Sequence, residues 1–80
     1  MAVYEIKISL KEGIVDPEGE NTKKSLELLG FRTVSHVSSY KLYSVTLRND
    51  SDGEATIEDM CRKLLANPAI HRYSYRKVSD

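Results

Sequence analysis

Hydrophobic and polar side chains alternate at the start of the chain, over residues 3–10. The hydrophobic face holds Tyr4, Ile6, Ile8 and Leu10. A period of two residues is typical of a β-strand that lays one face on the core. We therefore expect a strand here, which ends at Lys11-Glu12-Gly13.

A helix is expected next, over residues 17–29. Asp16 can accept hydrogen bonds from the free amides of the first turn, Pro17 suits the first helical position, and Gly30 can take the left-handed conformation that ends a helix. Its leucines lie in the second half, whereas residues 18–25 carry no large apolar side chain. Such a first half is either solvated or meets another chain.

Residues 31–48 contain two strand-like pieces, 33–38 and 42–48. In the second piece Tyr43, Val45 and Leu47 share one face. The segment Ser39-Tyr40-Lys41 joins the two as a tight turn or a bulge, and one long strand bent at a bulge would pair in a similar way.

The most regular helical pattern follows the loop at residues 49–53. Its apolar stripe has the spacing of a helix that packs on a sheet. The stripe consists of Ile57, Met60, Cys61, Leu64 and Leu65. Ser51 with Glu54 has the spacing of a capping box, although Asp52 could cap instead. Asn67 can take a left-handed stop, and Pro68 forbids continuation of the helix.

Residues 70–78 alternate again, with Tyr73 and Tyr75 on one face, and predict a closing strand. The predicted order is therefore β-α-β-β-α-β. Because crossover connections are right-handed, both helices should cover the same face of a sheet that contains antiparallel pairs. The expected fold class is α+β, a two-layer sandwich of ferredoxin-like order. Because the sequence shows no linker and no internal repeat, we predict that residues 1–80 form a single domain.

Charge and composition narrow the classes of function. Twelve basic and twelve acidic residues cancel, so the chain lacks the positive field that drives non-specific nucleic-acid binding. The single cysteine, Cys61, forms no internal disulfide, which fits a reducing compartment. We see neither a secretory signal nor an apolar run of membrane-spanning length, and expect a soluble cytoplasmic protein. A core of this size is thin, which favours oligomerisation.

Catalytic and metal-binding patterns are missing from the sequence. Cys61 lies on the apolar stripe, where a thiol is an inert core group, and His36 and His71 are far apart, without a cluster of ligands nearby. The acidic stretch 50–59 does not continue into a calcium-binding loop. These observations argue against a self-contained enzyme, and we expect no metal and no cofactor in this chain.

Two binding functions fit the order of elements. An RNA-recognition domain would stack bases on aromatic side chains of its central strands, for which Tyr40 and Tyr43 offer only a faint match. A regulatory module could present the amides of the loop from Gly13 to Gly19 to a small molecule such as an amino acid. The second reading is kept as the alternative function.

Two blocks of sequence are specific when taken together. The first is Leu10-Lys11-Glu12-Gly13-Ile14-Val15-Asp16-Pro17-Glu18-Gly19, followed by Leu26-Glu27-Leu28-Leu29-Gly30-Phe31. The second is Met60-Cys61-Arg62-Lys63-Leu64-Leu65-Ala66-Asn67-Pro68-Ala69-Ile70, with Tyr73 behind it. Both blocks resemble the PurS family, the small subunit of phosphoribosylformylglycinamidine (FGAM) synthase, and the resemblance spans nearly the whole chain. It departs at Tyr40, where family members commonly carry glycine, and at Thr22, where a more apolar residue is expected.

The resemblance implies a non-catalytic subunit of purine biosynthesis. It would form homodimers or higher oligomers, bridge a glutaminase subunit (PurQ) and an ATP-dependent synthetase subunit (PurL), and assist ammonia transfer between them. ATP and magnesium would be used by the synthetase subunit. The candidate partner contacts are Lys11, Gly13, Asp16, Gly19 and Lys41.

Overall fold

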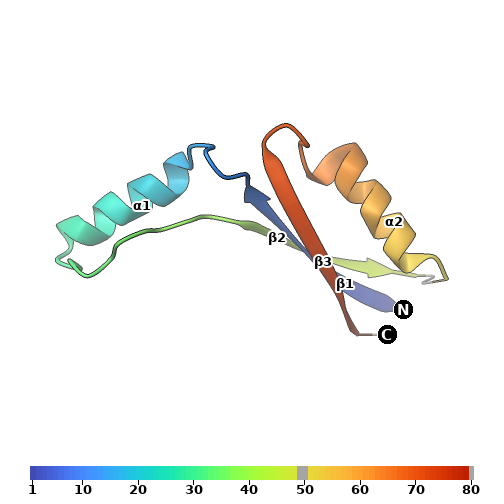
Figure 1. The fold of residues 1–80 in the computed structure, drawn as a ribbon. Helices are drawn as coiled ribbons and strands as arrows, with labels where there is room; N and C mark the ends of the chain where they lie inside the picture. The colour runs from blue at the N-terminus through green and yellow to red at the C-terminus, as the bar shows by residue number, and fades with distance from the viewer. Residues whose placement is uncertain (49–50, 80) are drawn as a thin grey trace.

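The computed structural model describes residues 1–48 and 51–79. Three strands and two helical segments follow one another along the chain (Figure 1). They are β1 (Ala2–Leu10), α1 (Pro17–Leu28), β2 (Lys41–Leu47), α2 (Gly53–Met60), which continues as a π-helical turn η1 (Cys61–Leu65), and β3 (His71–Ser79). The first strand, both helices and the last strand confirm the sequence prediction to within a few residues.

The sheet is antiparallel, with the order β2-β1-β3. Its central strand β1 pairs with β2 from Ala2↔Leu47 to Ile8↔Lys41 and with β3 from Leu10↔His71 to Val3↔Ser79. The predicted α+β class and antiparallel-containing sheet are therefore confirmed. Neighbouring strands run in opposite directions, as in a ferredoxin-like sheet.

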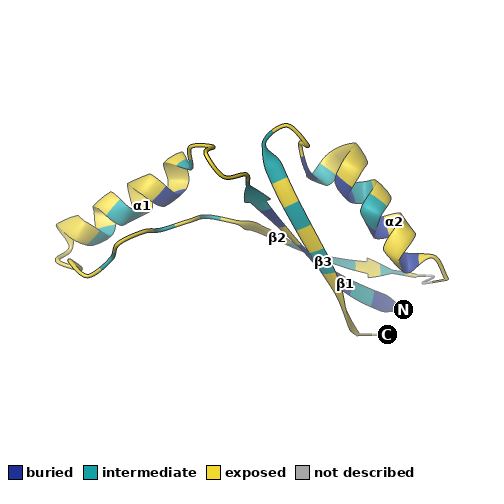
Figure 2. Cartoon of the chain, in the orientation of Figure 1, coloured by how far each residue is buried: buried dark blue, intermediate teal, exposed yellow. Residues whose placement is uncertain are grey.

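The core lies between the sheet and α2. The alternating face of β1 meets the apolar side of α2 and η1, as the dark segments in Figure 2 show. The buried residues are Ala2, Tyr4, Ile6, Ile8, Ile57, Cys61 and Ala66. Partly buried side chains of β2 and β3 complete this layer. Alternation along β1 thus predicted the core face correctly.

Two parts of the fold prediction are wrong for this chain. Helix α1 does not cover the sheet beside α2: it extends away from it (Figure 1), and no α1 residue belongs to the core cluster. Its polar first half offers no apolar stripe, so packing on the sheet would bury little hydrophobic surface. Only one helical layer, α2 with η1, therefore covers the sheet.

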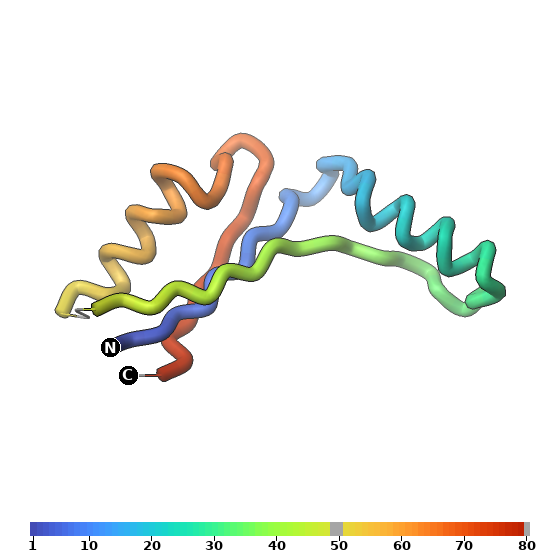
Figure 3. The backbone as a smooth tube through the Cα atoms, turned by 180° about the vertical axis from the view of Figure 1, so that it is seen from behind, coloured from blue at the N-terminus to red at the C-terminus, as the bar shows by residue number. Residues whose placement is uncertain are grey.

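The predicted strand over residues 33–38 also forms no ladder within the described residues. Residues 34–40 run on into β2 without a turn, as one long curved trace in Figure 3. Tyr40, in the segment predicted as a tight turn or a bulge, takes no turn conformation. As a result β2 is left as an edge strand.

The two helix ends differ from each other. Gly30 has φ +98°, the left-handed stop expected after α1. The prediction for Asn67 is wrong, because no described residue other than glycine has a positive φ. The helix instead ends where Ala66 becomes extended, and the Asn67 carbonyl accepts from the amides of Ile70 and His71 to form a turn.

Candidate functional site

The loop that leaves β1 is tied to the start of β3. The Lys11 amide donates to the Ile70 carbonyl at 2.8 Å, and its ammonium donates to the Pro68 carbonyl at 2.6 Å. Gly13, with φ +84°, allows the tight turn that follows. Lys11 and Gly13 thus shape this loop, and both are exposed on the surface.

Asp16 caps α1, as predicted, and it also binds a second segment of the chain. Its Oδ1 accepts from the Gly19 amide at 2.9 Å and from the Ser39 hydroxyl at 2.8 Å, and its Oδ2 accepts from the Ser39 amide at 2.7 Å. The bonds from Gly19 and then Ser39 hold the pKa of Asp16 below its ordinary value of 3.8. The carboxylate is therefore ionised at neutral pH and accepts three hydrogen bonds from its own chain.

Gly19 is buried in the first turn of α1. A Cβ at this position would lie 2.4 Å from the Val37 carbonyl oxygen and 2.7 Å from Asp16 Oδ2. Only a glycine lets the helix approach the extended segment this closely. The atoms nearest to Gly19 therefore belong to this chain, at Val37 and Asp16.

Lys41 is exposed at the start of β2, beside the same cluster. A shallow hollow of about 210 Å³ lies between the ends of β1, α1 and β2. It is lined by Ile8, Leu10, Asp16, Pro17, Glu18, Ser39, Tyr40, Lys41 and His71. The structure thus brings Asp16, Gly19 and Lys41 together at the base of α1, with Lys11 and Gly13 on the adjoining loop.

Sequence reasoning missed Ser39 as a partner of Asp16. The two are 23 positions apart, and the sequence predicts Ser39 in a turn or bulge. No local pattern connects a helix cap with a residue so far along the chain, so the contact becomes visible only in three dimensions.

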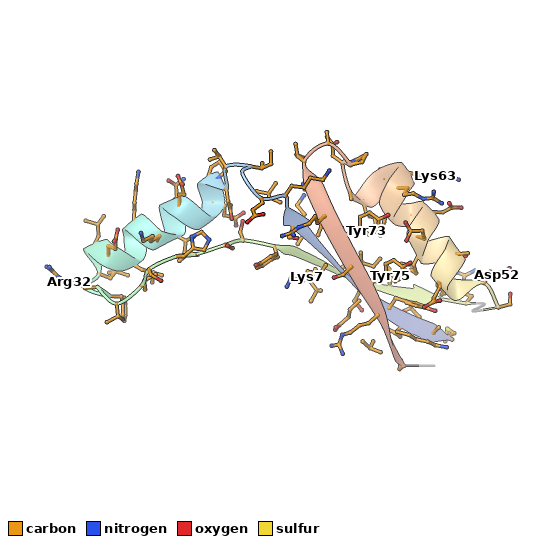
Figure 4. The ribbon with its side chains drawn as sticks, in the orientation of Figure 1. Lys7, Arg32, Asp52, Lys63, Tyr73 and Tyr75 are labelled. Atoms are coloured by element: carbon orange, nitrogen blue, oxygen red, sulfur yellow. The ribbon has the colours of Figure 1, made fainter. Side chains whose placement is uncertain are left out.

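A second polar cluster joins α2 to β3. The Glu58 carboxylate accepts from the hydroxyls of Tyr73 and Tyr75, the latter at 2.8 Å. Figure 4 labels the two tyrosines, between β3 and α2. These bonds lower the pKa of Glu58, and the same contact raises the pKa of Tyr75 to about 12. The shared face of the two tyrosines was predicted, but their acceptor on the helix was not.

The remaining reactive side chains serve the fold. Cys61 is buried, and desolvation raises the pKa of its thiol. His71 Nδ1 accepts from the Asn67 amide, and His36 bonds the nearby Ser38 hydroxyl. Residues 1–48 and 51–79 contain no group of three or more His, Cys, Asp or Glu that could hold a metal ion. In the same residues no helix is long and apolar enough to cross a membrane.

The aromatic pair considered for RNA binding is split. Tyr40 lies with its ring 4.2 Å from the Lys7 ammonium, on the sheet face that carries no helix, whereas Tyr43 packs against the core cluster. In the Gly13–Gly19 loop, the amides of Ile14 and Gly19 already donate to Lys11 and Asp16. The two tyrosines therefore do not form one stacking surface, and two of the loop amides are already used inside the chain.

Comparison with known proteins identifies the family. The family model described as PurS, phosphoribosylformylglycinamidine (FGAM) synthase, matches residues 3–79. The PurS subunit from Archaeoglobus fulgidus is 47% identical over 74 residues, which cover 90% of this chain and 92% of the relative. The crystal structure of Methanocaldococcus jannaschii PurS superposes with a TM-score of 0.89 at 36% identity, covering 100% of this chain and 99% of the other.

A chain of the Thermotoga maritima PurLQS structure shares the fold at 20% identity, with a TM-score of 0.74 and 96% of each chain covered. The match over nearly the whole length, in sequence and in fold, agrees with the two signature blocks. The chain belongs to the PurS family of FGAM synthase subunits.

Proposed function

We propose that this protein is the non-catalytic assembly subunit of an FGAM synthase complex, where it bridges a PurL-type synthetase and a PurQ-type glutaminase. Family membership supports the assignment, and the Thermotoga maritima relative belongs to a PurLQS structure. The observation that carries it is geometric: α1 and residues 29–40 extend away from the core, and apart from the packing between them most of their side chains are exposed. A chain with this shape offers surface for other chains.

In this assembly the chain would help to keep ammonia away from bulk water. Ammonia released by a glutaminase loses its nucleophilicity once it is protonated in bulk water, so a subunit that seals the junction protects it in transit. ATP and magnesium act in the synthetase subunit, and this chain needs no cofactor of its own. The complex works in the cytoplasm.

A second copy of the chain is the first partner. The radius of gyration is 16.1 Å, whereas about 12 Å is typical of a compact chain of this length. The accessible area of 6180 Å² exceeds that of a compact monomer of this mass by about 1,300 Å². A stable interface buries about 800 Å² on each side. The excess is therefore larger than one side of such an interface, as self-association requires.

The edge of the sheet indicates how two copies meet. In a ferredoxin-like sheet the segment before β2 would fold back along the outer edge of β2. Here residues 34–40 continue outward, so this segment and the β2 edge are both unpaired within the described residues. Two copies that exchange these segments pair both edges, as in a domain swap.

The experiment is reconstitution of the complex. Purified chain is mixed with the PurL-type and PurQ-type subunits of the same organism, with glutamine and ADP, and the mixture is passed over a sizing column. We expect co-elution of three subunits, and glutamine-dependent FGAM synthesis that falls to background when this chain is left out. Synthesis with ammonium salts in place of glutamine should not need it. Full glutamine-dependent activity without this chain would contradict the assignment.

The alternative, a free-standing small-molecule regulator, is tested by calorimetry. The isolated chain is titrated with amino acids and nucleotides in the absence of partners. Because the amides of Ile14 and Gly19 are already bonded inside the chain, we expect no heat of binding at micromolar concentrations. Tight binding without partners would favour the regulator.

A further inference from the structure

One carboxylate connects the two places where the chain passes between the sheet and its extension. We call α1 together with residues 29–40 the arm. The arm leaves the sheet through the loop after β1 and returns to it at the start of β2, as Figure 3 shows. Asp16 stands at the exit and Ser39 at the return, and three hydrogen bonds join them to each other and to α1.

These bonds are prominent because the extended half of the arm has few others. Among residues 33–40, only the Ser39 amide donates a backbone hydrogen bond within the described part of the chain. The arm contributes no residue to the core cluster, so hydrophobic packing does not hold its direction. Its orientation relative to the sheet is left to the polar contacts at its base.

Close packing around Gly19 also joins the helix to the extended segment. A Cβ there would meet the Val37 carbonyl and the Asp16 carboxylate well inside contact distance, so helix, carboxylate and extended segment interlock. A turn at Ser39 would break both of its bonds to Asp16. The interlocked state therefore excludes the folded-back path in which residues 34–40 cover the β2 edge of their own chain.

We propose that Asp16 is a positioning residue that locks the arm in the outward orientation and so keeps the β2 edge open for another chain. Ser39 and Gly19 complete this lock. The inference rests on the proposed assembly function. It means that one side chain, Asp16, decides whether residues 34–40 point outward or cover the β2 edge of their own chain. Asp16 acts through the arm and need not touch a partner.

The chemistry of the site gives graded variants. Both oxygens of Asp16 accept hydrogen bonds, from three donors in all. Asp16→Asn replaces one of these oxygens by an NH2 group, which cannot accept, so at least one of the bonds is lost. Asp16→Ala removes all three bonds, Ser39→Ala removes the hydroxyl bond alone, and Gly19→Ala forces the helix off the Val37 carbonyl. Glu18→Gln is the matched control, since Glu18 is an exposed acid in the same helical turn.

The direct readout is the distance from the arm to the sheet in full-length chain. Spin labels are placed at Arg32→Cys, near the tip of the arm, and at Lys63→Cys, on η1 (both labelled in Figure 4). The buried Cys61 is expected to stay unlabelled because desolvation disfavours its thiolate. Doubly labelled chain is diluted into a large excess of unlabelled chain, so that distances within one chain dominate.

We expect one narrow distance distribution in the parent and in Glu18→Gln. Asp16→Ala and Gly19→Ala should broaden it or add a shorter distance, and Ser39→Ala should lie between. Hydrogen exchange at the Ser39 amide should accelerate by about tenfold or more in Asp16→Ala. The dissociation constant for self-association should rise by a similar factor, while the unfolding cooperativity of the sheet is kept.

The distances separate this inference from the proposed function. An unchanged narrow distribution in Asp16→Ala would overturn the lock, even if wild-type chain assembled with its partners as proposed. Conversely, a wild-type chain that fails to assemble, yet shows the broadening in Asp16→Ala, would refute the assembly function and leave the lock standing. A weaker self-association with unchanged distances would mean that Asp16 contacts the partner directly, which also contradicts a positioning role.

Discussion

At the scale of single residues, partly exposed polar groups fix the angles between elements. Glu58, on α2, accepts hydrogen bonds from the hydroxyls of Tyr73 and Tyr75 on β3. These bonds fix the position of α2 over the sheet. Asp16 does the corresponding work for the arm. Neither carboxylate lies in the apolar core, and both have a lowered pKa because hydrogen bonds favour the ionised form.

Removal of one tyrosine hydroxyl should measurably destabilise the fold. Tyr75→Phe keeps the ring and loses the bond to Glu58, so we expect the thermal midpoint to fall by roughly 4–8 °C, as for one hydrogen bond of ordinary strength in a domain of this size. Tyr43→Phe is the control, since its hydroxyl makes no hydrogen bond within the described residues. Calorimetry at one fixed protein concentration measures both, and equal midpoints for the two variants would refute the role of the cluster.

The same cluster predicts loss of stability at both ends of the pH range. The folded pKa of Glu58 lies below its ordinary value of 4.5, so its contribution is present above that pH and is lost as the pH falls through the folded pKa. The folded pKa of Tyr75 is raised from 10.0 to about 12, so its contribution is present below pH 10 and is lost as the pH rises towards 12.

Urea midpoints measured across this range, in parent and variant, test the assignment. Glu58→Gln should lower the midpoint at neutral pH and weaken its dependence on pH below 4.5. Tyr75→Phe should flatten the alkaline limb. If the acid limb of Glu58→Gln runs parallel to that of the parent, other carboxylates cause it.

At the scale of elements, the π-helical turn changes which leucine is buried. The predicted stripe on α2 included Leu64, but the wider turn over Cys61–Leu65 places this side chain 83% exposed, while Cys61 stays buried. The α-helical spacing predicted the stripe correctly at Ile57, Met60, Cys61 and Leu65, which lie in or against the core. The prediction for Leu64 is wrong.

Alanine substitutions along α2 should report this change of period. Leu64→Ala should alter the free energy of unfolding by less than about 0.5 kcal/mol, as for exposed surface positions. Ile57→Ala empties a fully buried position and should cost about 2–5 kcal/mol. Chemical denaturation measures both changes, and a large loss in Leu64→Ala would mean that this side chain is covered in the oligomer.

At the scale of the whole molecule, the extended shape of the chain leaves large apolar side chains exposed to solvent. Its principal dimensions are 50 × 27 × 14 Å, and its most exposed apolar side chains include Leu28, Leu29 and Leu42. Leu42 lies on the open edge strand β2, where added charge opposes pairing with another chain.

The edge is tested by a pair of matched substitutions. Leu42 and Ser74 both lie opposite Lys7, one on β2 and the other on β3. A glutamate at either position faces the same lysine inside the chain, but only Leu42→Glu charges the edge proposed for self-association. We expect Leu42→Glu to weaken self-association by about tenfold or more and Ser74→Glu to leave it nearly unchanged. Light scattering over a dilution series measures this, and the opposite ranking would move the interface to β3.

The fold and the site were predictable to different degrees. The alternation of β1, the apolar stripe of α2, the Asp16 cap and the Gly30 stop are local patterns, and each of them was found. The sequence also showed that α1 has too few apolar residues to pack well, although not where the helix would go instead. The Asp16–Ser39 and Glu58–Tyr75 bonds join positions 23 and 17 apart, which no local pattern specifies.

By itself the sequence determined the class of fold, the core face of the sheet and the family, because periodicity, capping residues and two signature blocks are written in neighbouring positions. Only the tertiary structure decided that the arm points away from the sheet, that β2 keeps an open edge and that Leu64 turns outward. These outcomes depend on which distant groups satisfy one another. For the arm, two hydrogen bonds from Ser39 to Asp16 tie the returning segment to the base of α1, 23 positions earlier in the chain.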